Sequence, residues 1–269
     1  MRHVEAVVLD WAGTVVDFGS FAPTTVFVEA FKRAFDFDIS LEEARRPMGL
    51  GKRDHIRALG CDADIDTRWR RHFGSAMTEA QVNSLYATFM PLQVAKVAEH
   101  AGLIPGAGET LRWLRSQGVR IGSCSGYPRQ VMEALLPAAA AQGYAPDHVV
   151  ASDDLAAGSR PGPWMALANV VALGVGDVAA CVKVDDSAPG IHEGLRAGMW
   201  TVGLSLSGNE SGLTQAQFEA ADVATLAKAR LHASTQLREA GAHYVIDTIA
   251  DLPPVLLEIE SRRARGERP

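Results

Sequence analysis

The chain has 269 residues, enough for one large domain or for a core with a smaller second unit. Its hydrophobic content of 47% and charged content of 22% are ordinary for a soluble globular protein, and no apolar run is long enough to cross a bilayer. The net charge of -6 argues against nucleic acid as a partner. The N-terminus does not resemble a signal peptide, and three widely spaced cysteines indicate free thiols: Cys61, Cys124 and Cys181. We therefore expect a cytoplasmic protein that binds neither nucleic acid nor membranes.

The first predicted element is a short buried strand over residues 6–9, which are all apolar. Asp10 follows it directly, and Gly13 then turns the chain. Ligands of open α/β sheets bind at the carboxyl ends of strands, so we expect the Asp10 side chain to lie in the site. A carboxylate there can attack phosphorus and form an aspartyl-phosphate.

Residues 20–102 carry no convincing strand signal and are predicted to be helical. Apolar residues recur at helical spacing over 26–35, Ser40 with Glu43 resembles a capping box, and Thr78 is a candidate N-cap. Further helices are expected over 54–59, 67–73 and 78–100. We interpret the phenylalanine-rich stripe as core packing within this insertion, and a dimer contact by the same face is the alternative.

Strands and helices alternate along the rest of the chain. The expected strands cover 119–124, 148–151, 180–184, 200–204 and 244–246. The expected helices cover 109–117, 128–142, 163–173, 188–197, 214–240 and 252–265. This alternation predicts βαβ units in an α/β fold, with a Rossmann-like, mostly parallel sheet. We assign 1–19 and 103–269 to this core and 20–102 to an inserted helical domain.

Two polar residues lie in loops that follow later predicted strands. Ser125 and Gly126 come directly after a strand, where a hydroxyl and backbone N–H groups can bind phosphate oxygens. Arg160 precedes a proline-rich turn and offers a planar fork suited to such oxygens. Taken alone, the Ser125 signal favours an unliganded Ser-Gly turn, and Arg160 is equally a loop arginine in solvent.

Asp185 and Asp186 end the apolar strand predicted over 180–184. Two carboxylates at a strand end are costly unless a cation or water balances them. Mg²⁺ prefers a few carboxylates, a carbonyl and several waters, so we favour a magnesium site over two exposed turn acids. The eight histidines show no metal-ligand spacing, which argues against zinc.

These motifs, in this order, resemble those of the haloacid-dehalogenase superfamily: Asp10-x-x-Gly13-Thr14, then Ser125, Arg160 and Asp186. Most phosphatases of that superfamily carry a second acid two residues after the nucleophile, where this chain has Ala12. The stretch Asp-Trp-Ala-Gly-Thr instead resembles the phosphonoacetaldehyde hydrolase family. The likeness reaches the insertion, where that family also has Met-Gly, then Lys and His, at the spacing found over 48–55.

The resemblance implies roles for residues that the pattern alone leaves open. By itself Lys52 would be a solvated surface residue, but in that family the lysine forms a Schiff base with the substrate aldehyde. Met48 and His55 would then lie near the substrate, with His55 as a candidate proton relay. Burial, or the neighbouring charge of Arg53, would favour the neutral amine that such a reaction needs.

The implied metal ligands are Asp10, Ala12 and Asp186. Gly190 stands where an acid often follows the last of these, so Asp185 is a further direct or water-mediated candidate. The implied cofactor is Mg²⁺, the implied assembly is a homodimer, and the helical insertion would be a mobile cap domain.

The implied activity is hydrolysis of the carbon–phosphorus bond of phosphonoacetaldehyde, in degradation of phosphonates such as 2-aminoethylphosphonate. Two alternatives remain open. One is an ordinary phosphatase or phosphomutase of the same superfamily, against which Ala12 speaks. The other is a non-catalytic binding or regulatory protein, against which Asp10, Arg160 and Asp186 speak.

Overall fold

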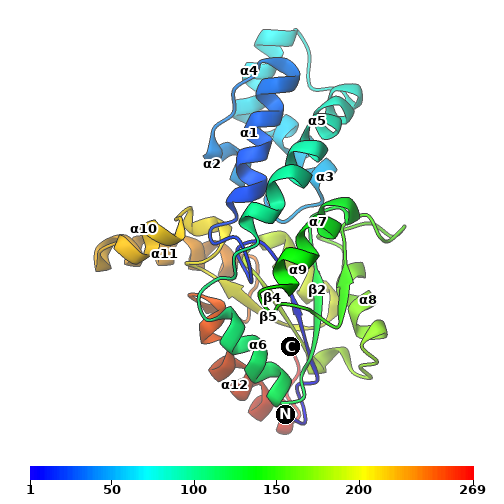
Figure 1. Ribbon diagram of the computed structural model, residues 1–269, viewed down its shortest axis with the longest axis vertical. Helices are drawn as coiled ribbons and strands as arrows, with labels where there is room; N and C mark the ends of the chain where they lie inside the picture. Colours follow the sequence, from blue (N-terminus) through cyan, green and yellow to red (C-terminus); the bar gives the residue numbers. More distant parts are fainter.

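A six-stranded parallel sheet forms the base of the molecule, and a bundle of helices stands above it (Figure 1). The computed structural model describes all residues, 1–269. The strand order is β3-β2-β1-β4-β5-β6, and every neighbouring pair is parallel. The strands are β1 (Ala6–Leu9), β2 (Arg120–Cys124), β3 (His148–Val150), β4 (Cys181–Asp185), β5 (Trp200–Leu204) and β6 (Tyr244–Ile246). The predicted Rossmann-like sheet is confirmed.

The register of the central strands brings the predicted site residues to one edge. Leu9 in β1 is paired with Ser123 of β2 on one side and with Val184 of β4 on the other. The residues that follow these positions therefore leave the sheet together. The carboxyl end of β1 is thus the centre of the expected site.

Helices cover both faces of the sheet, which explains why β1 is apolar at every position. Val7 and Leu9 pack with α6 (Ala107–Ser116), α7 (Arg129–Ala140) and α12 (Leu252–Ala264). Ala6 and Val8 face the opposite cluster, which contains α8 (Trp164–Ala172). A strand buried on both faces has no polar side to alternate with. Helix α9 (Ala188–Ala197) packs on β4 and β5.

The prediction of one helix over 214–240 is wrong, because this segment forms two helices. They are α10 (Gln215–Ala220) and α11 (Val223–Glu239). Ala221 and Asp222 between them are extended, and the Asp222 side chain accepts a hydrogen bond from the backbone N–H of Thr225 at 2.7 Å. An aspartate caps a helix start better than it continues a helix interior.

The insertion between β1 and β2 contains only helices, and these have a hydrophobic core of their own. They are α1 (Phe21–Phe35), α2 (Leu41–Arg45), α3 (Lys52–Cys61), α4 (Ala63–Phe73) and α5 (Glu79–Val97), followed by a short 3-10 turn (Ala98–His100). Phe27 and Phe31 are completely buried in that core, so the core-packing interpretation of the stripe is confirmed. The capping box at Ser40 and the N-cap at Thr78 are also confirmed.

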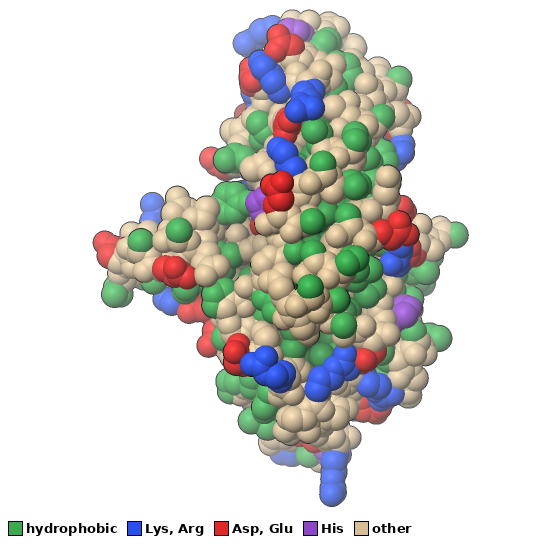
Figure 2. All heavy atoms as spheres, viewed as in Figure 1, with side chains coloured by type: hydrophobic (Ala, Val, Ile, Leu, Met, Phe, Trp, Pro, Cys, Tyr) green, Lys and Arg blue, Asp and Glu red, His purple; other side chains and the backbone are tan.

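The two connections between the insertion and the sheet lie side by side. The backbone N–H of Asp17 donates to the carbonyl of Gly102 at 3.2 Å, and His100 Nδ1 lies 3.0 Å from Asp17 Oδ1. The division into domains at 19/20 and 102/103 stays a prediction. On the face seen in Figure 2, acidic and basic side chains of the insertion are interspersed. The insertion also contains ion pairs, among them Arg68–Glu43 and Arg33–Glu29. None of the helices is both long and apolar enough to pass through a bilayer.

Candidate active site

Asp10 leaves the end of β1 and is almost completely buried. Its Oδ1 atom lies 2.8 Å from Nη2 of Arg160. Burial, with the nearby charge of Asp185, raises the pKa of Asp10 to about 6, although Arg160 opposes the rise. The carboxylate is therefore desolvated and ionised at neutral pH, as a nucleophile toward phosphorus would need to be.

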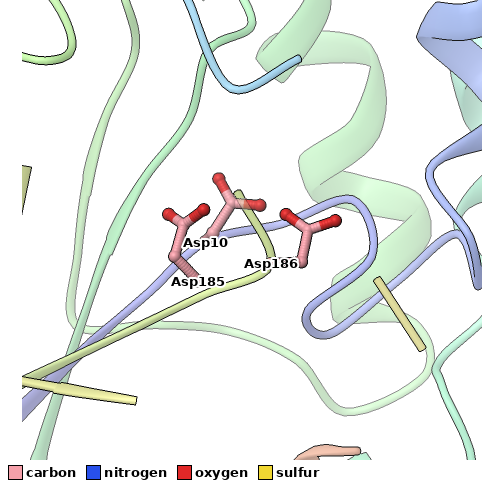
Figure 3. A group of neighbouring side chains, drawn as sticks. All are labelled: Asp10, Asp185 and Asp186. Carbon is pink, nitrogen blue, oxygen red and sulfur yellow. The ribbon is translucent and has the colours of Figure 1, made fainter. Parts of the chain in front are cut away.

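Asp10, Asp185 and Asp186 form one cluster of buried carboxylates (Figure 3). One oxygen from each lies within 4.8 Å of the others, and all three side chains point to the same side. Burial and the charges of Asp10 and Asp185 raise the pKa of Asp186 well above its usual range. Its Oδ2 atom accepts one hydrogen bond, from the backbone N–H of Asn209 at 2.8 Å. Arg160 and Lys183 form their ion pairs with other carboxylates, so a bound metal ion could balance the charge of Asp186.

Asp185 differs from its neighbour because its charge is already balanced. Although burial opposes ionisation, Arg160 and Lys183 lower the pKa of Asp185. Lys183 Nζ lies 2.8 Å from its Oδ2 atom, and the Ser187 hydroxyl donates to Oδ1 at 2.7 Å. A Cβ atom at Gly190 would lie 1.9 Å from the Asp185 carboxylate, so this position cannot hold an acid while Asp185 has its present place. The Asp185 carboxylate thus occupies the space that an acidic side chain at position 190 would need.

The residues fit a magnesium ion by their chemistry. The cluster offers carboxylate oxygens, and Ala12, whose only free oxygen is its backbone carbonyl, lines the same pocket. Hard oxygen ligands of this kind, with room for water, are what Mg²⁺ prefers. Gly13 has a φ of 81° and a Cβ there would lie 2.0 Å from Asp186 Oδ2, which explains the glycine of the first motif.

Arg160 is not the solvent-exposed loop residue of the alternative interpretation, since only 3% of it is exposed. Its Nη2 atom also donates to the Cys124 carbonyl at 3.1 Å, and its Nη1 atom donates to the Gly49 carbonyl at 3.4 Å. The side chain thus contacts both the core and the insertion. Its Nε atom donates to Glu193 at 2.9 Å.

Ser125 and Gly126 form the turn after β2. The Ser125 hydroxyl accepts a hydrogen bond from the backbone N–H of Tyr127 at 3.0 Å. A Cβ atom at Gly126 would lie 2.8 Å from the Leu50 carbonyl oxygen. Glycine is needed here because the insertion approaches the turn so closely.

Lys52 is the first residue of α3, and it is 4% exposed. The interpretation of Lys52 as a solvated surface residue is therefore wrong. Its Nζ atom lies 4.9 Å from the centroid of the Tyr127 ring, and burial together with Arg160 lowers its pKa to about 8. The cationic neighbour is not Arg53 as expected, because that side chain points away to Asn83 and the Tyr86 ring.

Met48 and His55 have different places. Met48 is buried and lines the pocket beside Lys52. His55 is fully buried but is not part of the pocket wall: Nε2 lies 2.9 Å from the Ala44 carbonyl, and its ring stacks on Phe27 at 3.8 Å. Burial and the charge of Lys52 hold the pKa of His55 well below its usual range. Its substrate contact and proton relay stay predictions.

One pocket collects side chains from the insertion and from the sheet. Of the residues singled out from the sequence, it is lined by Asp10, Ala12, Met48, Lys52, Ser125, Gly126, Arg160 and Asp186. Gly49, expected from its place in the stretch 48–55 to let the backbone approach a ligand, also lines the wall. Sequence reasoning assigned no role to three others in the wall: Ser20, Pro23 and Tyr127. It also missed Glu193 and Lys183. A lysine between two valines of a buried strand was the available signal, because a buried cation needs a buried acid.

Comparisons with known proteins agree with this geometry. Residues 4–198 match the haloacid dehalogenase-like hydrolase family. The chain is 62% identical to phosphonoacetaldehyde hydrolase of Klebsiella pneumoniae over 269 residues, covering 100% of both chains. It is 64% identical over 266 residues to that of Aeromonas hydrophila, covering 99% of this chain and 95% of the relative. A crystal structure of a phosphonoacetaldehyde hydrolase-like protein from Oleispira antarctica superimposes with a TM-score of 0.95 at 45% identity, covering 99% of this chain and 96% of the other. The chain therefore belongs to the phosphonoacetaldehyde hydrolase family of haloacid dehalogenase-like hydrolases.

Proposed function

We propose that this hydrolase cleaves the carbon–phosphorus bond of phosphonoacetaldehyde through an imine on Lys52 and an aspartyl-phosphate on Asp10. The observation that carries the proposal is the presence of both side chains in one pocket, with Ala12 where an acid would otherwise stand. The relatives from Klebsiella pneumoniae and Aeromonas hydrophila bear the name of this activity.

The first step is capture of the aldehyde. At a pKa of about 8, an appreciable fraction of Lys52 is neutral at neutral pH, so its nitrogen can attack the carbonyl carbon. A carbinolamine forms, its hydroxyl takes up a proton from solvent and leaves as water, and the nitrogen keeps its remaining proton as a cationic imine. Met48 and the Tyr127 ring, both nearly fully buried, help to exclude bulk water from this part of the pocket.

The second step breaks the carbon–phosphorus bond. An Asp10 oxygen attacks phosphorus, and the electron pair of the broken bond moves into the imine to form an enamine. Arg160, together with Ser125 and the backbone of Gly126, holds the phosphoryl oxygens. A magnesium ion held by Asp10, Ala12 and Asp186 would supply further neutralisation of the phosphoryl charge.

The last steps return the enzyme to its starting state. Water cleaves the aspartyl-phosphate to phosphate and free Asp10, the enamine is protonated on carbon, and hydrolysis of the resulting imine releases acetaldehyde from Lys52. Because the enamine is an adequate leaving group, no acid is needed at position 12 to protonate it. The proposal thus explains Ala12 and the buried Lys52 together.

The insertion has a place in this scheme as a cap domain over residues 20–102. It carries Lys52, whereas Asp10 belongs to the core, so the cap must be closed for both to act on one substrate. We also propose, from the family resemblance, a homodimer in the cytoplasm that serves degradation of phosphonates such as 2-aminoethylphosphonate.

Phosphate release tests the function against its alternatives. The purified protein should release phosphate from phosphonoacetaldehyde in the presence of Mg²⁺ and leave a generic phosphate ester untouched. Release from the ester alone would establish a phosphatase, and release from neither compound would favour a binding protein.

A further inference from the structure

A carboxylate outside the pocket forms an ion pair with Arg160 on the side of the guanidinium that faces away from the pocket. Glu193 lies on α9 and is completely buried, and its Oε2 atom accepts a hydrogen bond from Arg160 Nε at 2.9 Å. It is not among the residues that line the pocket. Its other oxygen, Oε1, has no hydrogen-bond partner.

The planar guanidinium makes the position of Nε important. Because the group is rigid, a bond that fixes Nε also fixes the direction of Nη1 and Nη2. These two nitrogens point forward, where Nη2 lies 2.8 Å from Asp10 Oδ1 and Nη1 reaches the Gly49 carbonyl at 3.4 Å. Nη2 also lies 3.1 Å from Asp185 Oδ2 and donates to the Cys124 carbonyl at 3.1 Å. The Glu193 contact is the one that holds Nε, on the side of the guanidinium away from the pocket.

Helix α9 gives Glu193 little freedom to move. A Cβ atom at Gly194 would lie 2.7 Å from the Cβ atom of Lys183 and equally close to Thr201, so the helix backbone packs tightly against β4 and β5 at this point. Lys183 Nζ lies 3.5 Å from Glu193 Oε2 and 2.8 Å from Asp185 Oδ2. The carboxylate thus stands between two buried cations.

We propose that Glu193 is a positioning residue that aims the guanidinium of Arg160 at the phosphoryl group. The inference rests on the proposed function, in that Arg160 is taken to bind the phosphoryl oxygens. The competing explanation is that Glu193 only balances the charge of buried Lys183 and has no influence on ligand binding.

The test uses inorganic phosphate, the proposed product, as the probe. We compare the unmodified protein, Glu193→Gln, Lys183→Met and the double variant, all with Mg²⁺, by calorimetric titration with phosphate and by thermal unfolding. Glu193→Gln should weaken phosphate binding by about tenfold or more, the equivalent of roughly 1.4 kcal/mol. It should also slow phosphate release from phosphonoacetaldehyde. Borohydride trapping at Lys52 should stay unchanged at saturating substrate and at a pH well above the Lys52 pKa of about 8, where the amine is neutral wherever Arg160 lies.

The double variant separates the two explanations. If Glu193 acts through Arg160, Glu193→Gln weakens phosphate binding equally in the Lys183→Met background. Restored phosphate binding in the double variant would overturn the proposal, because Glu193 would then serve Lys183 alone.

Glu193→Asp covers the case in which the glutamine variant does not fold. It keeps the buried charge but shortens the side chain, so it should fold and still bind phosphate more weakly. Unmodified phosphate affinity in this variant would also overturn the proposal. Phosphate is titrated without phosphonoacetaldehyde, so the two proposals can fail separately. If the protein does not cleave phosphonoacetaldehyde, the proposed function is wrong, but the phosphate titration still shows whether Glu193 positions Arg160.

Discussion

The Nζ atom of Lys52 lies 4.9 Å from the centroid of the Tyr127 ring, so the first residue of α3 faces the turn that follows β2. The contact joins the helical insertion to the sheet at the pocket that also contains Asp10. A lysine that would otherwise be solvated is thereby buried, and its burial lowers its pKa. The pocket therefore combines a contact between its two walls with a lowered Lys52 pKa.

The pH dependence of imine formation follows from that shift. Burial and Arg160 lower the pKa of Lys52 to about 8, and only the neutral amine attacks the aldehyde. The rate of borohydride trapping should therefore rise with pH through about 8 and level off above it. Stopped trapping reactions at a series of pH values measure this curve. A rate that keeps rising toward the ordinary lysine pKa of about 10.4 would contradict the expectation.

Removal of metal should abolish turnover. A chelator, or Asp186→Ala, should lower phosphate release by about a hundredfold or more, because a bound metal supplies several kcal/mol of charge stabilisation. Asp38→Ala is a matched control, since this acid lies on the surface of the insertion with its side chain 81% exposed. Full activity after exhaustive removal of metal would refute the magnesium site.

Closure of the insertion should depend on Gly49. This residue has a φ of 93°, and a Cβ atom there would lie 2.2 Å from the Ser187 hydroxyl oxygen on the core. Gly49→Ala should therefore hold the insertion away from the sheet and slow both imine trapping and phosphate release. Hydrogen exchange of the loop around Gly49 should increase in parallel.

Gly74→Ala is the control for that variant. Gly74 also has a positive φ, of 78°, but no atom lies within 4 Å of the added Cβ, so only the backbone cost of roughly 1–2 kcal/mol applies. Backbone strain should lower the free energy of unfolding of Gly74→Ala by an amount similar to that in Gly49→Ala, while the activity of Gly74→Ala stays unchanged. Equal activity of the two variants would show that the contact of Gly49 with the core does not matter.

The expected homodimer now rests on the family resemblance alone. The phenylalanine stripe, its other support, is largely buried, since Phe27 and Phe31 lie in the core of the insertion and Phe35 packs against Trp69 and Phe73. Sedimentation at micromolar concentration should still show a dimer, and a monomer there would refute it.

The sheet could be predicted from the sequence because its strands are short, apolar and separated by clear helix and turn signals. Asp10 and Asp186 could be placed at its edge for the same reason, since parallel strands end together. The break between α10 and α11 does not follow from the pattern alone, because an aspartate such as Asp222 can lie on the polar face of a longer helix as well as cap the start of a new one.

Contacts between segments that are distant in the chain could not be predicted from local sequence patterns. Burial of Lys52 depends on Tyr127, and the direction of Arg160 depends on Glu193, so neither follows from its own neighbours in the chain. Arg53 was named as the charge that affects Lys52 because it is adjacent in sequence. On a helix, however, adjacent residues point in different directions, and Arg160 is the cation that faces Lys52.

The most direct test of the proposed chemistry is borohydride reduction in the presence of phosphonoacetaldehyde, followed by peptide mass mapping. We predict irreversible inactivation and an adduct on the peptide that contains Lys52. Lys52→Arg should fold but lose both the adduct and carbon–phosphorus cleavage, whereas Asp10→Asn should keep the adduct and release no phosphate. Substantial cleavage by Lys52→Arg, or an adduct on exposed Lys32 or on buried, ion-paired Lys183, would contradict the mechanism.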